Sequence, residues 1–149
     1  MGDYKKLDVW RASCEFADRV DELIDTLPTV QRERALHQLG PAAHAIHENL
    51  AEGCGFDSDP QLLKYTKQSL ATASESEDEL LTLDRKNLLG DFGDLLDDIR
   101  RICAMLAKLK RRLEIDVARS RQPKAAPKRR AETESRERAR EARSDELSG

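Results

Sequence analysis

Apolar residues recur along the chain at the spacing of a helix face. Starting at Trp10, apolar or small residues follow at intervals of three and four positions: Ser13, Ala17, Val20, Ile24 and Leu27. Residues with this spacing lie on one side of an α-helix. The pattern predicts a first helix that begins near Asp8 as its N-cap residue and ends before Pro28.

A second helical pattern begins near Thr29 and continues to about residue 52. Its apolar positions keep the same spacing and are Leu36, Leu39, Ala43, Ile46 and Leu50. Pro41 lacks the N–H that would bind the carbonyl of His37, which predicts a kink at residues 40–41. Gly53 follows as the predicted residue beyond the helix end, where a positive φ is favourable for glycine.

Two more helices follow. Asp59 is the predicted N-cap of the third, with Pro60 at its first position. Its predicted inner face comprises Leu63, Thr66, Leu70, Ala73, Glu77 and Leu80. The small residues 69–74 suit close packing against a neighbouring helix or subunit. After a turn at residues 90–94, the fourth helix has a stripe that fits a left-handed bundle: Phe92, Leu95, Ile99, Ile102, Leu106, Leu109 and Leu113.

These patterns predict an all-α fold, an up-down-up-down four-helix bundle over residues 1–118. Residues 119–149 contain one large aliphatic residue, Leu147, and no aromatic residue. Such a segment cannot bury enough apolar surface to offset its ordering entropy. We therefore predict a disordered, charged C-terminal tail over residues 119–149.

Composition excludes several classes of protein. No apolar run approaches the ~20 residues that a membrane-spanning helix needs, and the first residues contain no apolar stretch typical of a signal peptide. Cys14, Cys54 and Cys103 are odd in number and far apart. They favour reduced thiols in the cytoplasm over a disulfide framework.

The charge is unevenly distributed. Residues 1–107 hold 12 Lys and Arg against 21 Asp and Glu, whereas residues 108–130 hold 10 against 2. We call residues 108–130 the basic segment. It predicts attachment to the phosphates of RNA or DNA, without base stacking, because it has no aromatic residue. The alternative is a solubilising tail that meets acidic surfaces. The candidate binding residues are Lys108, Lys110, Arg111, Arg112, Arg119, Arg121, Lys124, Lys128, Arg129 and Arg130.

No pattern indicates an active site, and we predict no enzyme activity and no cofactor. His44, His47 and Glu48 lie within one turn of the second helix, and these residue types bind metals. However, the Glu-x-x-His pair of a di-iron bundle is not repeated on a second helix. We therefore predict a polar helix flank there and no metal, with a metal-binding bundle as the less favoured reading.

Two short runs carry a resemblance to a known family. They are YKKLDVW at residues 4–10 and NLAEG at residues 49–53. Together they resemble the opening Leu-x-Val-Trp and the Asn-Ile-Ala-Glu-Gly motifs of the 23S ribosomal RNA intervening-sequence proteins. Further likeness at residues 27–28, 38–39 and 69–75 extends the resemblance over about residues 4–115.

The resemblance implies a small non-enzymatic bundle that assembles into a ring, often of five subunits. It also implies a relation to the accessory proteins of reverse transcriptases in diversity-generating retroelements, which bind the polymerase and nucleic acid. The motif residues Trp10, Asn49, Glu52 and Gly53 are expected to be structural: Trp10 as a buried anchor, Asn49 and Glu52 as hydrogen-bonding groups that hold the loop and a neighbouring helix.

Two arginines typical of the family are missing. Their places fall near residues 40–41 and at Phe56. Any nucleic-acid binding is therefore expected of the basic segment rather than of the acidic body. The predicted function is a homo-oligomeric accessory protein that binds RNA, DNA or a reverse transcriptase through this segment. The alternative is a pure protein–protein scaffold.

Overall fold

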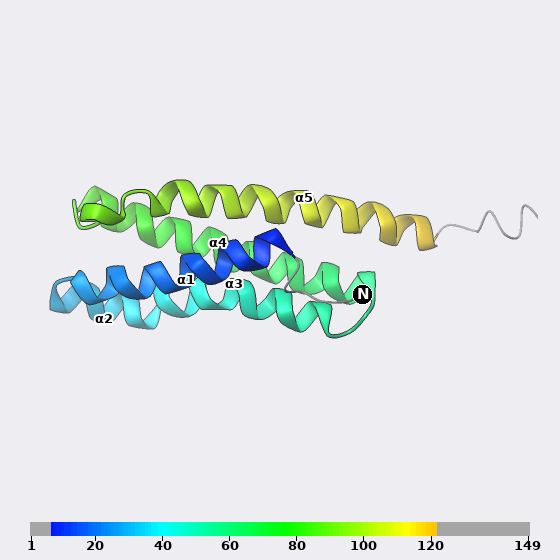
Figure 1. The fold of residues 1–149 in the computed structure, drawn as a ribbon, viewed down its shortest axis with the longest axis horizontal. Coiled ribbons are helices and arrows are strands. Elements are labelled where there is room, and N and C mark those ends of the chain that lie inside the picture. Colours follow the sequence, from blue (N-terminus) through cyan, green and yellow to red (C-terminus); the bar gives the residue numbers. More distant parts are fainter. Residues whose placement is uncertain (1–6, 122–149) are drawn as a thin grey trace, which may run out of the picture. The chain divides into compact units, whose positions relative to one another are not determined.

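A computed structural model describes residues 7–121, and every regular element there is helical (Figure 1). The elements are α1 (Asp8–Thr26), α2 (Thr29–His37), α3 (Leu39–Cys54), α4 (Asp59–Arg85), the short 3₁₀ helix η2 (Gly90–Phe92) and α5 (Leu95–Arg121). With α2 and α3 taken as one interrupted helix, the predicted all-α, four-helix fold is confirmed. None of the helices in residues 7–121 has the length and apolar character required to cross a membrane.

The chain divides into two units within α5, Met1–Ile115 and Asp116–Gly149. The packing described below belongs to the first unit. Residues 119–121 continue α5 as a helix, whereas the rest of the predicted tail lies outside the described residues. The division into a bundle over residues 1–118 and a tail over residues 119–149 stays a prediction.

The expected kink in the second helical segment is a break. Helix α2 ends at His37, the residue whose carbonyl Pro41 cannot bind, and Gln38 leaves helical geometry with φ −120° and ψ −64°. The interruption therefore precedes residues 40–41. Because the helical spacing does not carry across it, Leu36 is 56% exposed instead of buried, and α2 contributes only Ala35 to the core.

The predicted N-caps were wrong by one residue. Asp8 is the first residue of α1 and pairs with Arg11 at 3.0 Å on the helix surface. The cap of α4 is Ser58, whose Oγ accepts a hydrogen bond from the backbone N–H of Gln61 at 3.3 Å. Asp59 then lies in the first turn, where its negative charge interacts favourably with the helix dipole.

The apolar stripes of α1 and α5 form much of the core, as predicted. The α5 residues from Leu95 to Leu113 that were assigned to the stripe are buried, and Phe92 packs partly buried against them. The α4 face was partly mispredicted, because Leu63, Leu70 and Glu77 are only partly buried. The buried positions of α4 are Leu62, Thr66, Ser69, Ala73, Ser76, Leu80 and Leu83.

The inward position of small hydroxyl residues explains this difference. Thr66 Oγ1 donates to the carbonyl of Leu62 at 2.7 Å, and Ser76 Oγ donates to the carbonyl of Thr72 at 2.9 Å. A buried hydroxyl with a hydrogen bond avoids the cost of an unsatisfied polar group. The assignment of Leu63 and Leu70 to the inner face was therefore right only in part, since both pack partly buried against the core.

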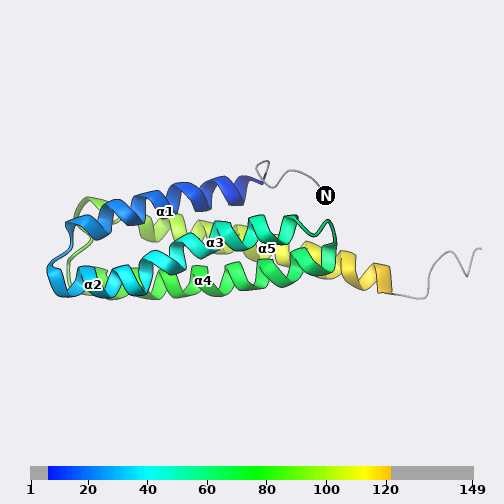
Figure 2. The ribbon, with the colours of Figure 1, turned by 90° about the horizontal axis from the view of Figure 1, so that it is seen from below.

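Small side chains let α3 and α4 approach closely, and the two helices lie side by side (Figure 2). Ser69 Oγ donates to the carbonyl of Ile46 on α3 at 2.8 Å. A Cβ atom added to Gly53 would lie 2.8 Å from the Cβ of Tyr65. Gly53 is a buried residue within α3, so its predicted place beyond the helix end was wrong. Glycine is required there for close approach, not for a positive φ.

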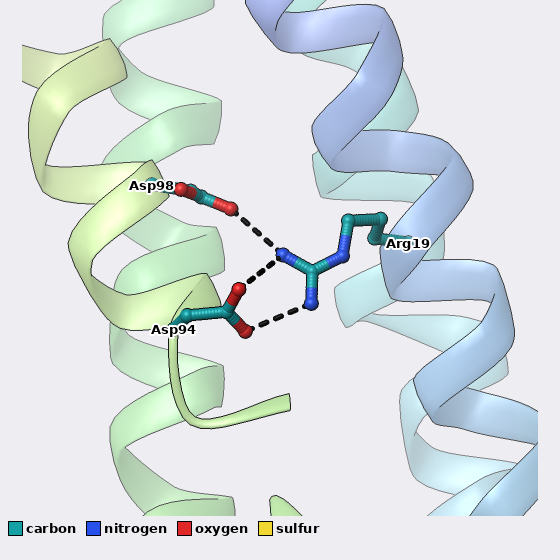
Figure 3. Close-up of polar contacts among 3 residues, drawn as sticks. All are labelled: Arg19, Asp94 and Asp98. Atoms are coloured by element: carbon teal, nitrogen blue, oxygen red, sulfur yellow. Dashed lines mark hydrogen bonds and ion pairs between the residues drawn. The ribbon is translucent and has the colours of Figure 1, made fainter. Parts of the chain in front are cut away.

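Arg19 connects α1 to the start of α5 (Figure 3). Its guanidinium donates to both carboxylate oxygens of Asp94, at 2.8 and 2.9 Å, and to Asp98 at 3.0 Å. It also lies over the ring of Phe92, 5.8 Å from the ring centre. The hydrogen bond from Arg19 holds the pKa of the Asp94 carboxyl below its ordinary value. We call this set of contacts the Arg19 bridge.

Gly53→Ala should destabilise the fold. The added Cβ would clash with the Cβ of Tyr65 on α4, so α4 must shift. A shift of this kind typically costs about 1–3 kcal/mol. Gly93→Ala is the matched control, since its added Cβ meets nothing closer than 4.0 Å. Urea denaturation measures both variants. Equal free energies of unfolding for Gly53→Ala and the wild type would contradict the close approach.

The Arg19 bridge should make stability depend on acid pH. Because the pKa of Asp94 is lowered in the folded state, its contribution is present at neutral pH and is lost as the pH falls below the ordinary carboxyl range of ~4. Arg19→Gln should therefore lose less stability than the wild type between pH 7 and pH ~3.

The control for this comparison is Arg11→Gln, which removes the same charge from the exposed pair with Asp8. Guanidinium or urea melts at both pH values provide the measurement. If the wild type and Arg19→Gln lost the same free energy of unfolding on acidification, Asp94 would contribute no stability through the bridge.

Candidate nucleic-acid interface

Six of the ten predicted binding residues lie on α5. Lys108, Arg111, Arg112, Arg119 and Arg121 are exposed, and Lys110 is partly buried. The other four, Lys124, Lys128, Arg129 and Arg130, lie outside the described residues. The structure therefore places the first part of the basic segment on a regular helix rather than on a tail.

The helix separates these cations onto different sides. Lys110 lies 3.8 Å from Glu114 one turn later, beside Lys67 and Ala71 of α4. Lys108, Arg111 and Arg112 instead border a groove of about 510 Å³. Within residues 7–121, none of these three cations forms an ion pair. Their charges therefore remain available to an anionic partner.

The groove has an apolar floor, which the sequence pattern did not indicate. We call it the α5 groove, and its apolar lining comprises Leu7, Val9, Met105, Leu109 and Ile115. Ile115 is 44% exposed at this groove. An apolar floor with a cationic rim combines surface typical of protein contacts with charges that attract phosphates.

The motif residues at the end of α3 have different environments. Gly53 is buried against α4, Asn49 is partly buried and Glu52 is exposed. Neither the Asn49 nor the Glu52 side chain has a hydrogen bond or ion pair to another residue in the described part of the chain. The expected hydrogen bonds that would hold the loop and a neighbouring helix are therefore not formed within residues 7–121.

Trp10 was expected to be a buried anchor and is partly buried. It packs against the core, while its neighbour Val9 is 5% exposed and takes the inward position. The first turn of α1 therefore turns Val9 rather than Trp10 most deeply into the core. The Trp10 ring covers apolar surface at the edge of the bundle.

A surface aromatic pair lies near the turn between α3 and α4. The rings of Phe56 and Tyr65 stack with centres 5.6 Å apart and planes 13° apart, and Phe56 is 49% exposed. The ammonium of Lys64 lies 5.5 Å from the Tyr65 ring centre. Periodicity could not reveal this pair, because Phe56 is in a turn. The signal was the aromatic residue itself, which stands where the resembling family has an arginine.

The three cysteines are free thiols, in agreement with the prediction. Burial raises the pKa of Cys54, and burial together with Glu77 raises that of Cys103. Burial and the carboxylates of Asp18 and Glu15 raise the pKa of Cys14. A raised pKa keeps the thiol protonated at neutral pH and therefore poorly nucleophilic. This chemistry favours a structural role for Cys54.

Comparison with known proteins gives one family. Residues 5–108 match the family model described as 23S rRNA-intervening sequence protein. The match covers both runs that carry the resemblance, all but the first residue of 4–10 and the whole of 49–53. No curated protein matches the chain.

Proposed function

The chain belongs to the 23S rRNA-intervening sequence protein family, and from this premise we propose that it is a non-enzymatic, homo-oligomeric bundle that attaches to RNA or DNA through α5. The observation that carries the proposal is the set of three exposed cations, Lys108, Arg111 and Arg112, at one groove without an ion pair in residues 7–121. Phosphate contacts from Lys and Arg supply most of the affinity in non-specific binding.

Three other cations of the bundle are already paired within the fold. Arg19, Arg34 and Arg100 each bind carboxylates of another helix, at 2.8 to 3.1 Å. Their charges are compensated within the fold. These three arginines are therefore less available to a polyanion than the cations of the α5 groove are.

A scaffold without nucleic-acid binding is the second candidate. The apolar floor of the α5 groove and the exposed Ile115 favour it, since apolar surface of this kind is typical of protein contacts. The resemblance supplies a reverse transcriptase as the protein partner that we propose for this case. Salt dependence separates the two candidates, because apolar docking is far less sensitive to salt than phosphate binding is.

Homo-oligomerisation is proposed from the family premise and from the outer side of α4. Ala71 and Ser74 are exposed there and line a groove of about 400 Å³ between α4 and α5. Small side chains allow the backbone of another helix to come close. This groove is the contact that we propose between subunits.

Nucleic-acid binding should weaken when the rim of the α5 groove is removed. Fluorescence anisotropy with single-stranded RNA and DNA oligomers should give a log–log salt slope of about −0.7 for each phosphate contacted. The variant Lys108→Ala/Arg111→Ala/Arg112→Ala should bind more weakly, with a shallower slope. Preference among sequences should be slight, because phosphate contacts carry no sequence information.

The matched control is Lys64→Ala/Lys86→Ala/Arg101→Ala, which removes the same charge from exposed positions elsewhere. Equal weakening by both triple variants would show attraction to overall charge and not to the α5 groove. If the full-length protein bound neither oligomer at low salt, the scaffold would be the remaining candidate function.

Deletion of residues 119–149 should leave the bundle folded and weaken binding further, since it removes six candidate cations.

The mass in solution should be several times the 16.9 kDa of one chain. Light scattering at tens of micromolar measures it, and a monomer would contradict the proposed assembly. Ala71→Glu should lower the mass by placing a charge in the proposed contact. Ala107→Glu is the control, because Ala107 is also exposed but lines neither groove described above.

A further inference from the structure

Three potential metal ligands converge on one turn of α3. His44, His47 and Glu48 each offer one ligand atom, and these atoms all lie within 4.8 Å of one another. The two imidazole rings are 5.6 Å apart, nearly perpendicular. Imidazole and carboxylate are the ligands that zinc and its neighbours in the periodic table prefer.

A second helix contributes to the same cluster. His44 Nε2 lies 2.9 Å from Oδ2 of Asp21 on α1, and α1 and α3 pack against each other (Figure 2). In a neutral ring that donates from Nε2, the lone pair is on Nδ1. A histidine whose second nitrogen is bound by a carboxylate is the usual arrangement at metal sites, because the carboxylate fixes the tautomer and the ring orientation.

We propose that His44, His47 and Glu48 bind a divalent transition-metal ion such as Zn²⁺, with Asp21 as the residue that positions His44. Ligand atoms around a tetrahedral ion at ~2.0–2.1 Å lie roughly 3.4 Å apart. In the structure the three ligand atoms lie within 4.8 Å of one another, so they must move closer together to bind an ion. The ion can enter from solvent, since the side chains of His44 and Asp21 are 35% and 54% exposed.

The charge of the surroundings favours a cation. Glu48 and Asp21 bring two carboxylates to the cluster. Two imidazoles with one carboxylate select against Mg²⁺ and Ca²⁺, which take nearly all their ligands from oxygen. With three protein ligands, the fourth coordination position is left to water.

The proposed site would couple metal binding to the packing of α1 on α3. The three ligands come together only when α3 is helical, and Asp21 orients one of them from α1. A ligand that binds only the folded chain stabilises it. The metal would therefore strengthen the half of the bundle that includes the break between α2 and α3.

Isothermal titration calorimetry of Zn²⁺ into the full-length, tag-free protein tests the proposal. One ion should bind per chain, and Zn²⁺ should raise the melting temperature. His44→Ala and His47→Ala should each abolish both effects, and Asp21→Asn should weaken binding by about 10- to 100-fold, as removal of such a carboxylate usually does.

His37→Ala and Cys14→Ser are the matched controls and should bind Zn²⁺ like the wild type. His37 is on α2, outside the cluster. Circular dichroism should first confirm that each variant is helical, and His44→Gln and His47→Gln replace any alanine variant that does not fold. Zn²⁺ binding that survives the loss of both histidines would place the ion elsewhere on the chain and overturn the proposal. So would equal binding of Mg²⁺, or the absence of any Zn²⁺ binding.

Discussion

The close contact between α3 and α4 is the constraint on which the rest of the bundle depends. Gly53 leaves no room for a Cβ against Tyr65, and Ser69 reaches the carbonyl of Ile46. Close approach of two backbones favours small side chains, and Ala73 and Ser76 are also buried on α4. The apolar stripes of α1 and α5 pack against this contact, and larger aliphatic residues of α3 and α4, such as Ile46 and Leu80, complete the core. The core is thus built mainly from aliphatic and small side chains, and the whole chain has six aromatic residues.

The ion pairs of the body have a geometrical role more than an energetic one. Exposed pairs typically contribute ~0–1 kcal/mol, but the Arg19 bridge fixes α1 against α5, and Arg100 with Glu77 fixes α4 against α5. These pairs also neutralise the charges of Arg19 and Arg100 within an acidic body. The cations left without a partner in residues 7–121 then include Lys108, Arg111 and Arg112 at the α5 groove.

Much of the fold could be predicted where one physical effect acts alone. The stripe of α5 was predicted residue by residue, because large aliphatic side chains at helical spacing have no better place than the core. Prediction failed where two effects compete. At α4, hydrogen-bonded hydroxyls and close packing put Ser69 inside in place of Leu70. At Leu36, the break at Gln38 rotates the face that the spacing implied. The candidate cations could be identified from composition. The apolar floor of the α5 groove could not, because its residues come from both α1 and α5 and meet only in the folded chain.

The NLAEG run at residues 49–53 contains two kinds of residue, which differ in whether packing within one chain explains them. Leu50 and Gly53 are explained by packing within the chain, since both are buried. Asn49 and Glu52 are not, because their side chains have no hydrogen bond or ion pair within residues 7–121. Polar groups at the end of a helix that packing within one chain does not use are available to a second chain or a ligand. In the proposed homo-oligomer, a second contact at the end of α3, besides the groove at Ala71 and Ser74, would give these two residues a role that the isolated bundle does not.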